Sequence, residues 1–225
     1  MSVFSRINYY LLLYNFRKKW RKLNMHNQTS AKYIFPPEIV NVGKNTYGLL
    51  EVYTWGEPEQ GLKIGSYVSI ASGVKFLLGG NHRMDAFSTF PFKVKFCGER
   101  VESLSKGKIV IEDDVWIGTD VLILSGAHIG KGAVIGARTV VSGKIPAYAI
   151  VVGNPGKIIK YRFDEKIIDK LENVDFNKID EKLLKDNVDL LYKPLTKDNL
   201  EEIFKKLKIN IWKIRYLNFI VLYLN

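Results

Sequence analysis

A sequence period of six residues predicts an all-β core in the form of a left-handed parallel β-helix. From Ile111 onward, six consecutive blocks read IEDDVW, IGTDVL, ILSGAH, IGKGAV, IGARTV and VSGKIP. Each block opens with an aliphatic residue and has a small or β-branched residue four places later, which in the last block is Ile145. Neither an α-helix nor a half-buried strand repeats its apolar residues with this period. Each hexapeptide is therefore expected to form one side of a coil, with three sides to a turn.

An earlier run of the same repeat is out of phase with the first. Its blocks IGSYVS, IASGVK and FLLGGN begin at Ile64, Ile70 and Phe76, and Ile111 follows Phe76 by 35 residues, one short of a multiple of six. Residues 77–108 are therefore predicted to leave the coil as an extruded loop. A long loop in a compact domain is more often functional than accidental.

The chain divides into three predicted segments. Residues 1–34 form a basic amphipathic segment, residues 35–160 form the β-helix with its loop, and residues 161–225 form a helical extension. Within this extension Leu200, Ile203, Phe204 and Leu207 recur at helical spacing, and Pro194 is expected to separate two helices. The final run, residues 209–224, is apolar and aromatic but too interrupted to predict a membrane span.

Composition limits the class of protein. The chain has 225 residues and a formal charge of +11, and its single cysteine, Cys97, excludes an internal disulfide framework and a cysteine-rich zinc site. No stretch of about 18 apolar residues predicts a spanning helix, and no secretory signal is apparent at the N-terminus. A cytoplasmic protein is expected.

The basic excess is concentrated near the N-terminus, where residues 1–30 contain six basic residues and no acidic one. Leucines and aromatic residues are interleaved with these bases. Two interpretations stay open: the segment lies peripherally on the inner, anionic membrane surface, or it packs its apolar face on the β-helix. No nucleic-acid-binding motif accompanies the charge, so nucleic acid is not an expected partner.

The predicted loop contains the most distinctive sequence in the chain, GGNHRMD at positions 79–85, followed by FSTFPF at 87–92. His82 follows two glycines, which permit unusual backbone angles, at the mouth of the loop. Histidine is the usual general base near neutral pH, which makes His82 the candidate catalytic residue. His128, at the end of a block, is expected to be structural.

The preceding stretch, residues 47–62, is predicted to be irregular. It places acidic and aromatic side chains together at Glu51, Tyr53, Trp55 and Glu57. Such groups can bind a sugar, and a surface loop with a buried Trp55 is an equal alternative.

Taken together, several motifs resemble a known family. These are the hexapeptide blocks, NHRMD at 81–85, STFPF at 88–92, DVWIG at 114–118 and YAIVVGNP at 148–155. Over about residues 38–163 the chain resembles the xenobiotic acetyltransferase branch of left-handed β-helix acyltransferases. That branch includes chloramphenicol and streptogramin acetyltransferases and the sugar O-acetyltransferases of bacterial surface polysaccharides.

The resemblance implies a homotrimer that uses acetyl-CoA, with active sites between neighbouring coils and His82 as the catalytic base. Donor-binding positions carried over from the family fall on Gly118, Ala137, Ser142, Gly143, Lys157 and Lys160, and Trp116 is expected to line the donor channel. The sequence departs from many relatives at Ser142-Gly143-Lys144, where they have Thr-Lys-Asp. It also lacks the tryptophan-rich segment that often follows the coil in the drug-modifying members.

The expected function is therefore transfer of acetyl from acetyl-CoA to a sugar hydroxyl of a surface polysaccharide, such as an O-antigen or capsule precursor. Tyr53 and Trp55 are candidates for binding the saccharide, while Asp85 could orient the imidazole or contact a sugar hydroxyl. No ligand cluster predicts a metal. The alternatives are acetylation of an antibiotic or of an amino sugar and, in another class, a catalytically silent trimeric scaffold.

Overall fold

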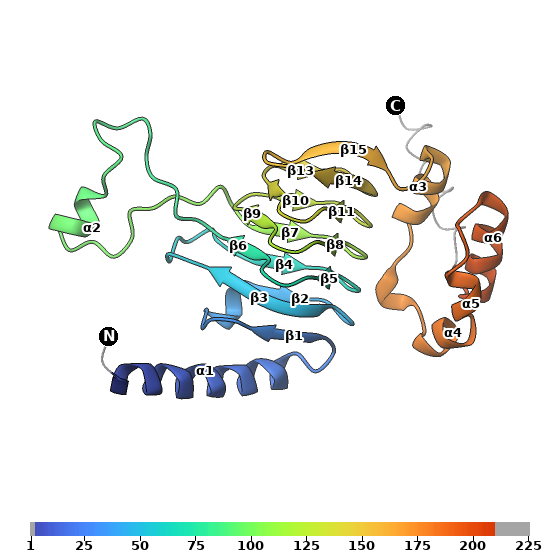
Figure 1. Ribbon diagram of the computed structural model, residues 1–225, viewed down its shortest axis with the longest axis horizontal. Coiled ribbons are helices and arrows are strands. Elements are labelled where there is room, and N and C mark those ends of the chain that lie inside the picture. Colours follow the sequence, from blue (N-terminus) through green and yellow to red (C-terminus); the bar gives the residue numbers. More distant parts are fainter. Residues whose placement is uncertain (1–2, 210–225) are drawn as a thin grey trace, which may run out of the picture. The chain divides into compact units, whose positions relative to one another are not determined.

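The computed structural model describes residues 3–209 and separates them into two compact units, one ending at Arg162 and one beginning at Phe163. The first unit is a coil of short parallel strands, and the second is a group of short helices (Figure 1). Each unit has a hydrophobic core of its own.

The coil has three parallel ladders of strands, as the six-residue period predicts, and is a left-handed parallel β-helix. The first ladder contains β3 (Tyr47–Tyr53), β5 (Ser69–Ile70), β8 (Trp116–Ile117), β11 (Val134–Ile135) and β14 (Ala149–Val152). The second contains β2 (Val40–Val42), β4 (Leu62–Ile64), β7 (Ile109–Ile111), β10 (His128–Ile129) and β13 (Lys144–Ile145). The third contains the end of β3, β6 (Lys75–Leu77), β9 (Leu122–Leu124) and β12 (Val140–Val141).

Two further strands extend the first ladder at its ends. β1 (Gln28–Ala31) pairs in parallel with β3, and β15 (Lys157–Tyr161) pairs antiparallel with β14. Because β3 runs through residues predicted to be irregular, the expectation for positions 47–53 was wrong. This strand turns a corner between two ladders, so its hydrophobic pattern does not follow a single hexapeptide block.

The core confirms the repeat. The first residues of the blocks that start at Ile111 through Val141 are buried, and so are the small or β-branched residues four places later, from Val115 to Thr139. Ile145 is different, because it pairs with Ile129 in the second ladder and so opens a block rather than filling a fifth position. The prediction for Ile145 was wrong because the corner at Ser142-Gly143 is shortened, with Gly143 at φ +70°.

The N-terminal helix α1 (Val3–Leu23) packs one face on the coil. Trp20 is 1% exposed and contacts the ring of Phe35, and the Arg17 Nε donates a hydrogen bond to the Ala31 carbonyl oxygen at 2.7 Å. The opposite face exposes apolar side chains near the N-terminal end and lysines toward the other. None of the helices within residues 3–209 combines the length and the apolar character needed to cross a membrane.

The helical unit contains α3 (Glu165–Glu172), α4 (Glu181–Asp186), α5 (Val188–Leu191) and α6 (Lys197–Lys206), with a short 3-10 turn at Phe176–Lys178. Pro194 lies between α5 and α6, as predicted. The residues predicted at helical spacing, Leu200, Ile203 and Phe204 on α6 and Leu207 at its end, are buried in the core of this unit. The predicted apolar run at residues 209–224 lies outside the described residues after position 209.

Candidate functional site

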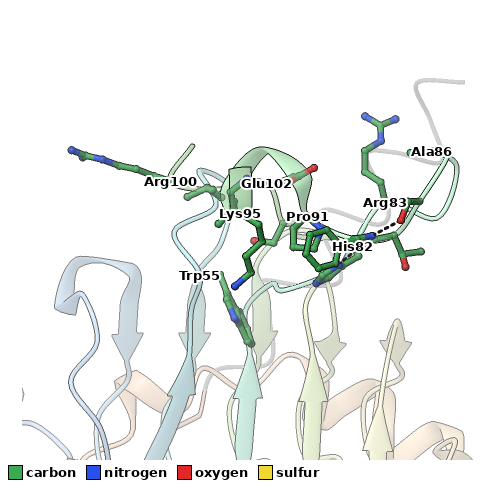
Figure 2. A pocket seen from close by; sticks show the side chains of 14 residues that line it. Trp55, His82, Arg83, Ala86, Pro91, Lys95, Arg100 and Glu102 are labelled. Carbon is green, nitrogen blue, oxygen red and sulfur yellow. Dashed lines mark hydrogen bonds between the residues drawn. The ribbon is translucent and has the colours of Figure 1, made fainter. Parts of the chain in front are cut away.

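The predicted loop is present, because the chain leaves the third ladder after β6 and returns to the second at β7. This loop, residues 78–108, contains the short helix α2 (Phe92–Phe96) and extends away from the coil (Figure 1). It encloses a pocket of about 470 Å³ between its outgoing arm, its returning arm and Trp55. Figure 2 shows His82 and Trp55 on the lining of this pocket, together with Lys95, Arg100 and Glu102 from the helix and the returning arm.

The His82 ring is held by one backbone group. Its Nδ1 lies 2.6 Å from the carbonyl oxygen of Thr89. Because a carbonyl oxygen can only accept, Nδ1 must be the donor, so in the neutral ring the lone pair is on Nε2. Within the described part of the chain Nε2 has no hydrogen-bond partner. The ring is therefore in the tautomer that a general base requires, on the lining of a pocket.

The base of the loop is a narrow neck, in which the outgoing and returning arms bind each other. Asn81 and Leu104 exchange two backbone hydrogen bonds, of 3.1 and 2.8 Å. The side-chain amide of Asn81 also donates a hydrogen bond to the Leu104 carbonyl oxygen at 2.9 Å. Nearer the coil, the Ser105 hydroxyl donates to the Leu78 carbonyl oxygen at 2.6 Å. His82 is the first residue beyond this neck, so its backbone position is fixed by the neck.

Two glycines of the outgoing arm, Gly79 and Gly80, lie in close contact with residues 54–61. A side chain on Gly79 would place its Cβ 2.3–2.5 Å from the Glu57 carboxylate, and Gly80, at φ +82°, lies 3.0 Å by the same measure from the Trp55 ring. Glu57 is 3% exposed, and its Oε1 accepts a hydrogen bond from the Gly80 amide at 2.7 Å. Burial acts to raise the pKa of Glu57, but hydrogen bonds from the Ser103 side chain and the Gly80 amide outweigh it and lower that pKa.

The acidic and aromatic side chains predicted as a group are divided by the structure. Trp55 is 45% exposed and lines the pocket, so the alternative of a buried Trp55 was wrong. Tyr53 lies outside the pocket, edge-on to Tyr33, and burial is the largest of the effects that raise its pKa. Glu51 is also outside the pocket, buried, and paired with Lys32 at 2.6 Å. Of this group only Trp55 is placed to contact a molecule in the pocket.

Asp85 lies just beyond His82 but does not hold its ring. Both carboxylate oxygens of Asp85 accept hydrogen bonds from the Arg83 guanidinium, at 3.1 and 2.9 Å, and this pairing lowers the pKa of Asp85. The orienting contact on the imidazole comes from the Thr89 backbone instead. A backbone carbonyl has no sequence signal, which is why this partner was not predicted.

The residues predicted to bind the donor lie on the coil and do not line this pocket. Gly118 packs on Ala137 at the corner between the first and third ladders, where a Cβ on Gly118 would be 2.7 Å from the Ala137 nitrogen. Trp116, 57% exposed, faces outward from β8. Lys157 and Lys160 are exposed on β15.

Ser142 and Gly143 occupy a different corner, the one from which the loop also leaves the coil. The Gly143 carbonyl oxygen accepts a hydrogen bond from the His128 amide at 2.9 Å. The same corner in the preceding turn of the coil contains Ser125, whose hydroxyl accepts a hydrogen bond from the side chain of Asn81 in the neck. Within one chain, then, the predicted donor residues lie along two corners and one edge strand, apart from His82.

His128 is confirmed as part of the coil surface, where its Nε2 lies 2.7 Å from a Glu112 oxygen. Residues 3–209 contain no group of three or more histidine, cysteine or acidic side chains arranged to hold a metal ion.

Comparison with known proteins agrees with the hexapeptide-repeat fold. Residues 108–143 match the family model for the bacterial transferase hexapeptide (six repeats). A probable macrolide acetyltransferase of Lysinibacillus sphaericus is 40% identical over 137 residues, which are 58% of this chain and 76% of the relative. A chloramphenicol acetyltransferase of Agrobacterium fabrum is 39% identical over 158 residues, covering 62% of this chain and 75% of the relative.

Among solved structures, galactoside acetyltransferase in complex with coenzyme A superimposes with a TM-score of 0.50, at 20% identity, over 72% of this chain and 82% of that one. This likeness concerns the fold. The coil and its loop define a left-handed β-helix of hexapeptide repeats. With the sequence relatives, they show that the chain belongs to the hexapeptide-repeat acetyltransferases.

Proposed function

We propose that this chain transfers an acetyl group from acetyl-CoA to a hydroxyl of a surface-polysaccharide saccharide, with His82 as the general base. The observation that carries the proposal is the 2.6 Å contact between His82 Nδ1 and the Thr89 carbonyl oxygen, which leaves the Nε2 lone pair available in the pocket.

The chemistry follows from that tautomer. Nε2 takes the proton of the acceptor hydroxyl as its oxygen attacks the thioester carbonyl, and the Thr89 carbonyl then stabilises the imidazolium through Nδ1–H. When the tetrahedral intermediate collapses, the C–S bond breaks and Nε2 returns the proton to the CoA sulfur. General-base assistance of this kind contributes about 10²–10⁴-fold to a rate.

The lining of the pocket supports a polar acceptor with one apolar face. The half-exposed ring of Trp55 offers a flat apolar surface, and the side chain of Lys95 is directed toward it (Figure 2). Arg100 and Glu102 also belong to the lining, and the Glu102 carboxylate accepts a hydrogen bond from the Lys93 amide at 3.0 Å. A sugar ring has both characters. The names of the two sequence relatives favour a second candidate, a hydroxyl of a macrolide or chloramphenicol-type antibiotic.

Acetyl-CoA is proposed to bind along the coil, with its chain close to Gly118, Ala137, Ser142 and Gly143 and its phosphates near Lys157 and Lys160. His82 is exposed in the single chain, whereas acyl transfer requires water to be kept from the intermediate. A homotrimer would both bring the donor-binding residues near His82 and cover the pocket from water, because a second copy could place its coil corner against the pocket.

We also propose that the enzyme is cytoplasmic and contacts the inner membrane surface through the outward face of α1. Ile7, Leu11 and Tyr14 are each more than half exposed, and Lys18 and Lys22 continue the same helical face. Apolar side chains beside lysines are the composition of an interfacial helix, which binds anionic lipid through both.

Turnover of acetyl-CoA, followed by thiol release, tests the proposal with a panel of acceptors: polysaccharide-derived oligosaccharides, amino sugars, chloramphenicol and a macrolide. O-acetylation of an oligosaccharide, with the ester located by mass spectrometry, is the expected result. Turnover with the antibiotics alone would select the second candidate, and no turnover with any acceptor by a folded protein would favour a silent scaffold.

A further inference from the structure

The buried carboxylate of Glu57 lies directly beneath the segment that leads to His82. It belongs to the connection 54–61 between β3 and β4, whose shape is held by a hydrogen bond from the Thr54 hydroxyl to Gln60. Glu57 does not line the pocket, and at 3% exposure it is closed to substrate. Its contacts therefore point to a role within the protein.

Those contacts are with both arms of the neck. Oε1 accepts from the Gly80 amide on the outgoing arm at 2.7 Å, and the Ser103 side chain on the returning arm acts to lower the pKa of the carboxylate. A Cβ on Gly79 would collide with the same carboxylate, and a Cβ on Gly80 would lie only 3.0 Å from the Trp55 ring. The carboxylate and the indole together determine the path of the backbone two residues before His82.

We propose, on the basis of the function proposed above, that Glu57 is a positioning residue: it holds Gly79 and Gly80 so that His82 enters the pocket with Nδ1 directed at Thr89. The backbone path and the Thr89 carbonyl then fix the imidazole from two sides. Without the Glu57 carboxylate the Gly80 amide loses its acceptor, and the glycine pair, which has no side chains to restrain it, gains freedom. A displacement of about 1 Å at a catalytic group can cost on the order of 10²-fold in rate.

The variants separate this role from simple stabilisation. Glu57→Ala removes the acceptor, Glu57→Asp shortens its reach, and Glu57→Gln keeps an oxygen for the Gly80 amide. Glu51→Gln is the matched control, because Glu51 is equally buried but pairs with Lys32 away from the pocket. The chain has three histidines, so NMR of the ring signals reports on His82 with His26 and His128 as internal references.

For Glu57→Ala and Glu57→Asp we expect the His82 ring signals to shift while the other two stay fixed. We also expect kcat to fall by about 10- to 100-fold with the KM for acetyl-CoA within about two-fold. Glu57→Gln should retain most of the wild-type kcat and leave the His82 ring signals close to their wild-type positions. The NMR arm does not depend on acetyl transfer, so it tests the positioning role even if the proposed function fails. Unchanged His82 signals and kcat in folded Glu57→Asp, or equal losses in Glu51→Gln, would overturn the proposal.

Discussion

His82 and Thr89 are seven residues apart on the same loop, and the carbonyl oxygen of Thr89 accepts a 2.6 Å hydrogen bond from His82 Nδ1. The loop thus closes on itself, and the closure selects the ring tautomer. This local contact lets one chain prepare the base in advance, while the residues proposed for the donor stay on the coil. The loop therefore positions the base, while the coil carries the residues proposed to bind the acetyl donor.

Replacing the base should stop the chemistry and spare the fold. His82→Ala is expected to lower kcat by at least about 100-fold, equivalent to about 2.7 kcal/mol of transition-state stabilisation, because the acceptor hydroxyl loses its proton acceptor. Acetyl-CoA affinity, measured by calorimetry, should change little. His128→Ala, on the outer surface of the coil, is the control and should keep wild-type turnover. Near-normal turnover by folded His82→Ala would remove His82 from the role of base.

Trp20 should hold α1 to the coil. Its ring is 1% exposed, packs 5.2 Å from the Phe35 ring centre and donates a 3.1 Å hydrogen bond to the Thr29 hydroxyl. Trp20→Ala is expected to lower the free energy of unfolding by about 3–5 kcal/mol, measured by denaturant titration. Tyr10→Ala, at a position 68% exposed on the same helix, should change it by less than about 0.5 kcal/mol. Equal effects of the two variants would contradict this packing.

Membrane contact through α1 can be tested without deleting the helix, because deletion would also remove the buried Trp20. Lys18→Glu with Lys22→Glu should weaken co-sedimentation with phosphatidylserine vesicles by at least roughly 30-fold at low salt, because loss of each lysine alone removes about 1 kcal/mol of attraction. Their effect should shrink at high salt because charges are screened. Lys63→Glu with Lys144→Glu changes the net charge equally on the second ladder. If both pairs reduce binding alike, α1 is not the membrane surface.

Two glycines with similar backbone angles should respond differently to alanine. Gly132, at φ +65°, has the Tyr148 ring 2.3 Å from its Cβ position, while Gly143, at φ +70°, has open space there. Gly143→Ala should cost about 1–2 kcal/mol from the left-handed backbone alone. Gly132→Ala should cost about 1–3 kcal/mol more from overpacking. Equal unfolding free energies for the two variants would show that Tyr148 moves aside freely.

The lowered pKa of Glu57 predicts a pH dependence of stability. Because the folded protein favours the ionised carboxylate, its contribution is present above the ordinary glutamate pKa of about 4.3 and is lost as pH falls through the lower folded value. The stability difference between wild type and Glu57→Gln should therefore shrink between pH 6 and pH 3 in thermal melts. A difference independent of pH in that range would contradict the lowered pKa.

Much of the coil could be predicted from the sequence, because a period of six reports a packing rule that repeats at Ile111, Ile117 and the block openings after them. The extruded loop was also predictable, from the phase shift between Phe76 and Ile111. The prediction failed where the repeat itself is broken: at β3, which turns a corner, and at Ile145, which follows a shortened corner. Local sequence does not show which corner of the coil is formed by fewer residues, since that depends on how the strand pairs with the turn beneath it.

The sequence by itself determined the β-helix, the position of its loop and the choice of His82 as the candidate base. These depend on spacing and residue type along the chain. Only the tertiary structure decided that Trp55 lines the pocket, that Glu51 and Glu57 are buried apart from each other, and that Asp85 pairs with Arg83. The reason is that hydrogen-bond partners such as the Thr89 carbonyl and the Gly80 amide are backbone groups, present at nearly every position, and only the folded path of the chain selects which of them meet.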